Sequence, residues 1–337
     1  MEKEGCVSRL FRVSVPKFEE VRHRVLQLSR KPIALPKSVK KRGMVKYLER
    51  IKSIYTYLDS AIFSLPAKLP RSGELHPFYR ELLKAASIES YDDIVGKLAG
   101  FRRVLRNLTL RYSLRVKESL DVNESRKLFR EYVGRALSIV RRTREDLEML
   151  ARAISELRRM PCINLNELKV VVAGMPQVGK STFVKSVSSA NPKISPFPFT
   201  TREIIVGHTL ISGRRVQVID TPGILDRPPE MLNNVELRAL AALRYLADAV
   251  VFLIDPSRDS YYSLEQQLNL LKNVLEHFRQ GRVLVAINKV DRVDNLRLSE
   301  VLRAVARLFK GDIMVMSALK GINTVEVLKR ATDLAHC

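Results

Sequence analysis

The stretch GMPQVGKS, from Gly174 to Ser181, constrains the fold of this chain more than any other feature of its sequence. It stands between a valine-rich apolar run, KVVVAG, and a segment with helical spacing that begins at Lys180. Glycines let the backbone fold around an anion, and the N-terminus of the following helix favours negative charge at the same place. The pattern GxxxxGKS between a strand and a helix therefore predicts a phosphate-binding loop.

We expect this loop and its first helical turn to contact a nucleotide throughout. Backbone amides wrap the phosphates, Lys180 reaches the β and γ oxygens, and Ser181 can bind Mg²⁺. The predicted contacts are Gly174, Met175, Pro176, Gln177, Val178, Gly179, Lys180, Ser181 and Thr182.

The sequence around the loop has the pattern of an α/β domain. After Pro161, the β-branched runs KVVVAG, EIIVGHTL, RRVQVID, ADAVVFLID, RVLVAIN and DIMVMS predict strands. Helical segments near 180–190, 234–246, 262–279, 298–309 and 323–335 separate most of them. The turn residues ISGR between the second and third runs predict a hairpin. We therefore expect a mostly parallel sheet flanked by helices, with an antiparallel edge.

The first half of the chain has helical spacing and few glycines. Residues 121–160 predict one long helix of roughly ten turns, with Asp121 and Glu124 as a capping pair. Residues 38–63 and 92–118 predict two more long helices, and 75–88 a shorter one. The expected architecture is an antiparallel helical bundle in residues 1–161, followed by the α/β domain in residues 162–337.

The motif NKVD, residues 288–291, predicts which base the site binds. The Asp291 carboxylate can accept the N1 and N2 protons of guanine together, whereas adenine has no such pair of donors. Lys289 can lay its methylene stem over the base, and Ser317 and Ala318 after the last strand can offer a backbone amide to guanine O6. The expected ligands are therefore GTP and GDP, and the contacting residues are Asn288, Lys289, Asp291, Ser317, Ala318 and Leu319.

Two segments between these motifs could sense the γ-phosphate. Asp220 in DTPG would hold Mg²⁺ through water, and the amide of Gly223 would touch the γ-phosphate. The stretch FPFTT offers a hydroxyl to the metal, and we choose Thr201 over Thr200. Further nucleotide contacts are expected from Phe199, Thr200, Thr221 and Pro222. The predicted metal ligands are Ser181, Thr201 and Asp220, and the predicted catalytic groups are Lys180, Thr201 and Gly223.

The order GMPQVGKS, FTT, DTPG, NKVD, SAL resembles a translation-factor-type GTPase. More narrowly, FPFTTREIIVGH, DTPGILDRP and SLEQQLNLL resemble the nucleolar GTP-binding (Nog-type) family of Obg-related GTPases. ELHPFYRELL and REYVGRALSIVRR resemble the N-terminal helical domain of that family. The resemblance covers nearly the whole chain and implies a GTPase that acts in maturation of the large ribosomal subunit. The chain lacks the C-terminal extension of the eukaryotic members, and in this it resembles the shorter archaeal form of the family.

Two positions depart from common GTPase patterns. Ile224 follows DTPG at the position where many such enzymes carry a water-orienting glutamine. The family resemblance implies that an apolar residue at this position is shared by Obg-related GTPases in general. We therefore expect slow intrinsic hydrolysis that is accelerated on the pre-ribosomal particle. Gln177 stands where relatives usually have an asparagine, which in some of them helps to bind a potassium ion, so potassium stimulation is left open.

The net charge of +23 favours a polyanionic partner. Residues 1–160 hold 36 Lys and Arg against 19 Asp and Glu, which accounts for 17 of the 23 excess positive charges. Because no lipidation signal or basic helix with an aromatic face accompanies this charge, we expect nucleic acid rather than a membrane. The family resemblance implies that this nucleic acid is ribosomal RNA, bound by the helical domain. The densest stretch, RKPIALPKSVKKR, contains two prolines and predicts an extended arm.

Several function classes are disfavoured by the sequence. No apolar stretch approaches the ~18 to 20 residues of a membrane span, and the first residues lack a secretory pattern, so a cytoplasmic protein is expected. The three cysteines lie far apart without metal-ligand spacing, which argues against a metal site and a disulfide framework. We also expect the protein to be a monomer. The alternative function is a GTP-dependent binding switch that signals to a protein or membrane partner. An ATP-driven enzyme conflicts with Asp291.

Overall fold

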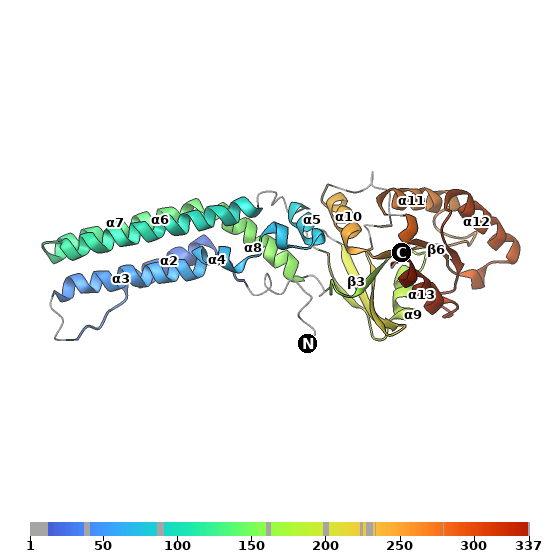
Figure 1. Ribbon diagram of the computed structural model, residues 1–337, viewed down its shortest axis with the longest axis horizontal. Helices are drawn as coiled ribbons and strands as arrows, with labels where there is room; N and C mark the ends of the chain where they lie inside the picture. The colour runs from blue at the N-terminus through green and yellow to red at the C-terminus, as the bar shows by residue number, and fades with distance from the viewer. Residues whose placement is uncertain are drawn as a thin grey trace. The chain divides into compact units, whose positions relative to one another are not determined.

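The computed structural model describes residues 13–36, 41–85, 91–159, 163–197, 202–222, 225–226, 232, 234–278 and 280–335 (Figure 1). The chain divides into two compact units. The helical unit comprises Arg9–Glu74 and Ile88–Ser155, and the sheet unit comprises Met1–Ser8, Leu75–Ser87 and Glu156–Cys337. No described helix is long and apolar enough to cross a lipid bilayer.

The helical unit is built on four packed helices, α2 (Phe18–Arg30), α3 (Arg42–Leu58), α6 (Tyr91–Glu118) and α7 (Val122–Arg142). A π-helical turn (Asp59–Phe63), α4 (Leu65–Lys68) and a 3₁₀ turn (Ser72–Glu74) follow α3. In α6 the buried residues are three, four or seven positions apart, as in Leu98, Leu105, Leu108 and Tyr112, so one stripe faces the core. Figure 1 shows α6 and α7 side by side. The predicted helical bundle is confirmed.

The predicted ten-turn helix was wrong in one respect, because it is two helices. Asp121 caps α7 by accepting the Glu124 N–H at 2.8 Å, as expected, but α7 ends before Thr143 and α8 (Arg144–Arg159) begins after it. Thr143 is fully buried, and its hydroxyl donates to Val140 O at 2.8 Å. A threonine that bonds back to the preceding turn competes with helical geometry, and periodicity alone does not reveal such a break.

The sheet unit contains a seven-stranded sheet in the order β2-β3-β4-β1-β5-β6-β7. The strands are β1 (Leu168–Ala173), β2 (Lys193–Pro196), β3 (Glu203–Ile211), β4 (Arg214–Asp220), β5 (Ala249–Ile254), β6 (Val283–Ile287) and β7 (Ile313–Val315). Strands β4, β1, β5, β6 and β7 are parallel to one another. At one edge β3 pairs antiparallel with β4, and β2 pairs antiparallel with β3. The predicted sheet and hairpin are confirmed, whereas β2 was missed because KISP has no strand pattern of its own.

Four longer helices lie in the strand connections that the structure describes in this unit, and a fifth follows the last strand. They are α9 (Lys180–Val187), α10 (Asn234–Leu246), α11 (Leu264–His277), α12 (Asn295–Leu308) and α13 (Thr324–Leu334), with 3₁₀ turns at Gln280–Arg282 and Val290–Arg292. Strands β5 and β6 are buried along their whole length, which explains their unbroken apolar sequences.

One helix from the N-terminal half packs in the sheet unit. Helix α5 (Pro77–Ala85) lies against α10 and buries Phe78, Leu82 and Leu83. The spacing of α5 predicts a helix with one apolar face but does not identify the surface that covers it. A single domain boundary at residue 161 stays a prediction, since packing groups this short segment with residues that follow that boundary.

Candidate nucleotide-binding site

The sheet order brings the predicted motifs to one edge. The phosphate loop follows β1, DTPG follows β4, and NKVD and SAL follow β6 and β7. All four strands are parallel, so their carboxyl ends lie along the same side of the sheet. Open α/β sheets commonly bind ligands at this edge, where loops from neighbouring strands converge.

The phosphate loop requires glycine at two positions. Gly174 has φ +134°, and a Cβ there would lie 2.6 Å from the carbonyl oxygen of Leu253 in the neighbouring strand. Gly179 has φ +103°, and a Cβ there would collide with the side-chain amide of Asn288. Both positions need backbone angles that other residues rarely adopt. The loop is therefore held close to β5 and to the NKVD motif.

The Lys180 ammonium lies inside the loop. Its Nζ donates to the carbonyl oxygens of Gly174 at 2.9 Å and Met175 at 3.0 Å, and it lies 3.9 Å from an Asp226 oxygen. Burial lowers the pKa of this ammonium below its ordinary value, although Asp220 and Asp226 oppose the shift. A buried cation is costly unless it is paired, so a polyphosphate would be a strongly favoured partner here.

Ser181 and Asp220 meet beside the ammonium. The Ser181 hydroxyl donates to Asp220 Oδ2 at 2.7 Å, and the other carboxylate oxygen, Oδ1, is buried without a hydrogen-bond partner among the described residues. Burial raises the pKa of Asp220 above its ordinary value, against the opposing effects of Lys180 and Ser181. Oxygen donors of this kind fit a hard divalent cation such as Mg²⁺.

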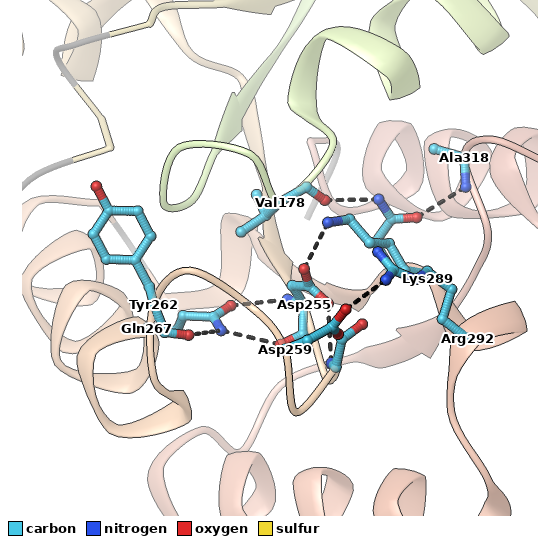
Figure 2. Close-up of polar contacts among 10 residues, drawn as sticks. Val178, Asp255, Asp259, Tyr262, Gln267, Lys289, Arg292 and Ala318 are labelled. Atoms are coloured by element: carbon cyan, nitrogen blue, oxygen red, sulfur yellow. Dashed lines mark hydrogen bonds and ion pairs between the residues drawn. The ribbon is translucent and has the colours of Figure 1, made fainter.

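Asn288 joins three of the predicted segments. Its Nδ2 donates to Val178 O in the phosphate loop at 2.8 Å, and its Oδ1 accepts the backbone N–H of Ala318 at 2.8 Å (Figure 2). Its own N–H donates to Ile254 O at the end of β5. The side chain is 2% exposed, so these bonds are shielded from water. One amide therefore fixes the phosphate loop against the two segments predicted to bind the base.

Lys289 makes a contact that the sequence did not predict. Its Nζ donates to Asp255 Oδ2 at 2.6 Å, and Asp255 comes directly after β5 (Figure 2). Burial raises the pKa of the Asp255 carboxyl, but hydrogen bonds from Lys289 and Ser257 outweigh it, and the pKa lies below its ordinary value. The sequence held one signal for this contact, an acidic residue directly after the buried strand β5. The carboxyl ends of the parallel strands converge, so such a residue is expected near the other motifs.

Only some of the residues predicted to bind the base have groups that are accessible to a ligand. Asp291 is exposed in the short turn after Lys289. The Ala318 amide, predicted as a donor to guanine O6, here donates to Asn288, and the Ser317 amide donates to Ile322 O. Leu319 is 77% exposed, and its amide makes no hydrogen bond to any described residue. A direct contact to O6 from SAL stays a prediction, with the Leu319 amide as the accessible donor.

Several predicted site residues lie outside the described residues: Phe199, Thr200, Thr201, Gly223 and Ile224. The ends of the first of these segments are described. The Phe197 N–H donates to Arg202 O at 2.8 Å, and Arg202 Nε donates to Glu236 Oε1 at 2.9 Å. Glu236 is in the first turn of α10, so this ion pair connects the residue that follows FPFTT to the helix that follows the DTPG segment.

Comparison with known families matches both halves of the chain. The model described as the NOG1 N-terminal helical domain matches residues 13–164, and the model for nucleolar GTP-binding protein 1 (NOG1) matches residues 234–291. An uncharacterised protein of Methanocaldococcus jannaschii is 33% identical over 250 residues, which cover 74% of this chain and 70% of that protein.

Longer relatives match as well. Nucleolar GTP-binding protein 1 of Drosophila melanogaster is 30% identical over 292 residues, covering 85% of this chain and 45% of the relative. This chain thus spans less than half of such relatives. A crystal structure named as a nucleolar GTP-binding protein 1 from Plasmodium falciparum has a TM-score of 0.45 at 27% identity, covering 52% of this chain and 90% of that one.

The Asn288 bridge leads to a testable prediction. Replacing Asn288 with Asp keeps an acceptor for Ala318 but removes the donor to Val178 O and places a carboxylate against that carbonyl. Because losing a buried hydrogen-bond partner costs about 1 to 3 kcal/mol, we expect nucleotide affinity to fall about tenfold or more. Fluorescent GDP dissociation measures this. The exposed Asn269→Asp on α11 is the control, and equal rates for both variants would contradict the role of the bridge.

Proposed function

The chain belongs to the nucleolar GTP-binding protein 1 (NOG1) family, and on that premise we propose that it is a GTP-binding, GTP-hydrolysing switch in large ribosomal subunit assembly. The observation that carries the proposal is the Asn288 side chain, which joins the phosphate loop to the base motif. A ligand that occupied both segments would need a polyphosphate at one end and a base at the other. A guanine nucleotide has these features.

Guanine selectivity rests on Asp291. An exposed carboxylate beside the rigid Asn288 is free to accept two protons from a base, and the two donors of guanine suit it. Adenine would present an acceptor to this carboxylate and would be rejected. GTP and GDP would bind equally well on this side of the site, because they differ only in the γ-phosphate.

Hydrolysis requires charge neutralisation and an oriented water. Lys180 would neutralise the β and γ oxygens, and Ser181 with Asp220 would hold Mg²⁺, which supplies further charge stabilisation when it is bound. The side chain of Ile224 cannot hydrogen-bond a water molecule. We therefore assign orientation of the water to a bound partner or to other groups of the site, which makes the intrinsic rate slow.

The helical unit would dock on ribosomal RNA. On α6, the exposed residues Arg103, Arg106 and Lys117 lie on one helical face and form no ion pair with an acidic side chain of the described residues. On α7, Lys127, Arg130 and Arg141 are likewise exposed. Unneutralised cations along a helix bind phosphates and give affinity with little sequence selectivity.

A second candidate function is a GTP-dependent switch that binds a protein. The same face of α6 also exposes Leu110 at 55% and Leu114 at 56%, and RNA phosphates do not require leucine. Cosedimentation distinguishes the candidates. The ribosomal proposal requires the chain to travel with large-subunit precursors from cell extract, and its absence from those fractions would favour the protein-binding switch.

The guanine proposal predicts a change of base preference. Asp291→Asn replaces a double acceptor with a side chain that can donate to the 2-oxo group of xanthine. We expect GTP affinity to fall at least about a hundredfold, because the base loses a charged hydrogen bond and gains a mismatched group, while XTP binding improves. Competition against fluorescent GDP and XDP measures both. Unchanged GTP preference would refute the assignment of Asp291.

The RNA proposal predicts a salt-dependent effect of charge removal. In the full chain, Arg103→Gln, Arg106→Gln and Lys117→Gln together should weaken binding to large-subunit RNA and reduce the slope of log K against log salt by about two. The matched control removes three exposed cations in α12 and just after it, with Arg303→Gln, Arg307→Gln and Lys310→Gln. Equal losses in both triple variants would refute a role specific to α6.

A further inference from the structure

Asp255 is held more rigidly than an ordinary loop carboxylate. Gln267 of α11 accepts the Asp255 N–H at 2.8 Å and donates to its carbonyl oxygen at 3.0 Å, so both backbone groups are fixed by one side chain. The N–H of Ser257 donates to Oδ1 at 3.0 Å. Gln267 is 1% exposed and Asp255 is 4% exposed. This carboxylate therefore has one orientation, and its second oxygen points to Lys289 (Figure 2).

Lys289 is fixed at its other end by the backbone. Its φ is 58°, a left-handed conformation that costs a non-glycine residue free energy and sets the direction in which the side chain leaves. The preceding Asn288 is bonded to two loops, and the following Asp291 is the proposed guanine acceptor. Because Nζ is held by Asp255 at 2.6 Å, the methylene stem between these fixed ends has little freedom.

We propose that Asp255 is a positioning residue for guanine nucleotides, which holds the Lys289 stem extended as a wall of the base site. This inference rests on the proposed function. Without the carboxylate, the ammonium of Lys289 would move freely and could turn to the phosphates. Preorganisation by Asp255 means that binding does not have to order this long side chain, which otherwise costs free energy.

A neighbouring ion pair provides a matched comparison. Arg292 and Asp259 lie 2.7 Å apart, nearly the distance of the Lys289–Asp255 pair, and they connect the same two loops (Figure 2). Their side chains are 50% and 70% exposed, whereas that of Asp255 is 3% exposed. Exposed ion pairs contribute little, so removing Asp259 should have no effect on the base site.

The test uses the full chain and fluorescent analogues of GDP and GTP, with dissociation rates measured by stopped flow. We expect Asp255→Asn to accelerate release of both nucleotides by the same factor, about five- to twentyfold (about 1 to 1.8 kcal/mol), because the Lys289 side chain must then be ordered on binding. Asp259→Asn should release both at the wild-type rate. Wild-type rates for Asp255→Asn would overturn the proposal.

A double-mutant cycle separates positioning from a general structural role. Lys289→Met keeps the stem and removes the ammonium, so Asp255→Asn should have no further effect on release in that background. Effects that multiply would show that Asp255 acts without Lys289 and would overturn the proposal. The double variant contains no unpaired buried charge, so it remains informative if either single variant folds poorly.

The same data separate failure of this inference from failure of the proposed function. A wild-type chain that does not bind GTP would refute the guanine-nucleotide function itself. Tight wild-type binding with unchanged release from Asp255→Asn would leave that function intact and remove only the positioning role. Thermal unfolding of each variant without nucleotide identifies changes in release that come from loss of folded protein.

Discussion

The site depends on one buried amide. Asn288 uses its donor on the phosphate loop, 110 residues earlier in the chain, and its acceptor on the loop after β7, 30 residues later. Neither loop has another described side chain that fixes it to the base motif in this way. We infer that this side chain assembles the two ends of the nucleotide site without help from a ligand, because both of its bonds are made to the protein itself.

Burial gives the same site its affinity for charge. Lys180 and Asp220 are both nearly inaccessible, and burial shifts the pKa of each toward the neutral form. Asp220 is incompletely satisfied, because its Oδ1 has no hydrogen-bond partner among the described residues. A phosphate beside the lysine and a divalent cation beside the carboxylate would each relieve this. The buried charges after β1 and at the end of β4 therefore destabilise the fold, and a bound ligand would offset this cost.

Much of the fold could be predicted from local patterns. Apolar runs located six of the seven strands, and the spacing in α6 located its buried stripe, because period and burial are linked directly. Strand β2 and the break at Thr143 could not be predicted, since the first depends on pairing with β3 and the second on one buried hydroxyl. At the site, motifs identified Lys180 and Asn288. Asp255 belongs to no motif, and Gln267 lies in the family-like stretch SLEQQLNLL without a predicted role, because both act through contacts formed only in the folded chain.

Amide hydrogen exchange at Ala318 tests directly whether Asn288 assembles the site. Ala318 donates its N–H to Asn288, whereas the neighbouring amide of Leu319 has no described acceptor. In nucleotide-free protein, we predict that Ala318 exchanges much more slowly than Leu319 after correction for intrinsic rates, and that Asn288→Ala removes the difference. Equal exchange at the two amides until a guanine nucleotide is added would show that the ligand, rather than Asn288, assembles the site.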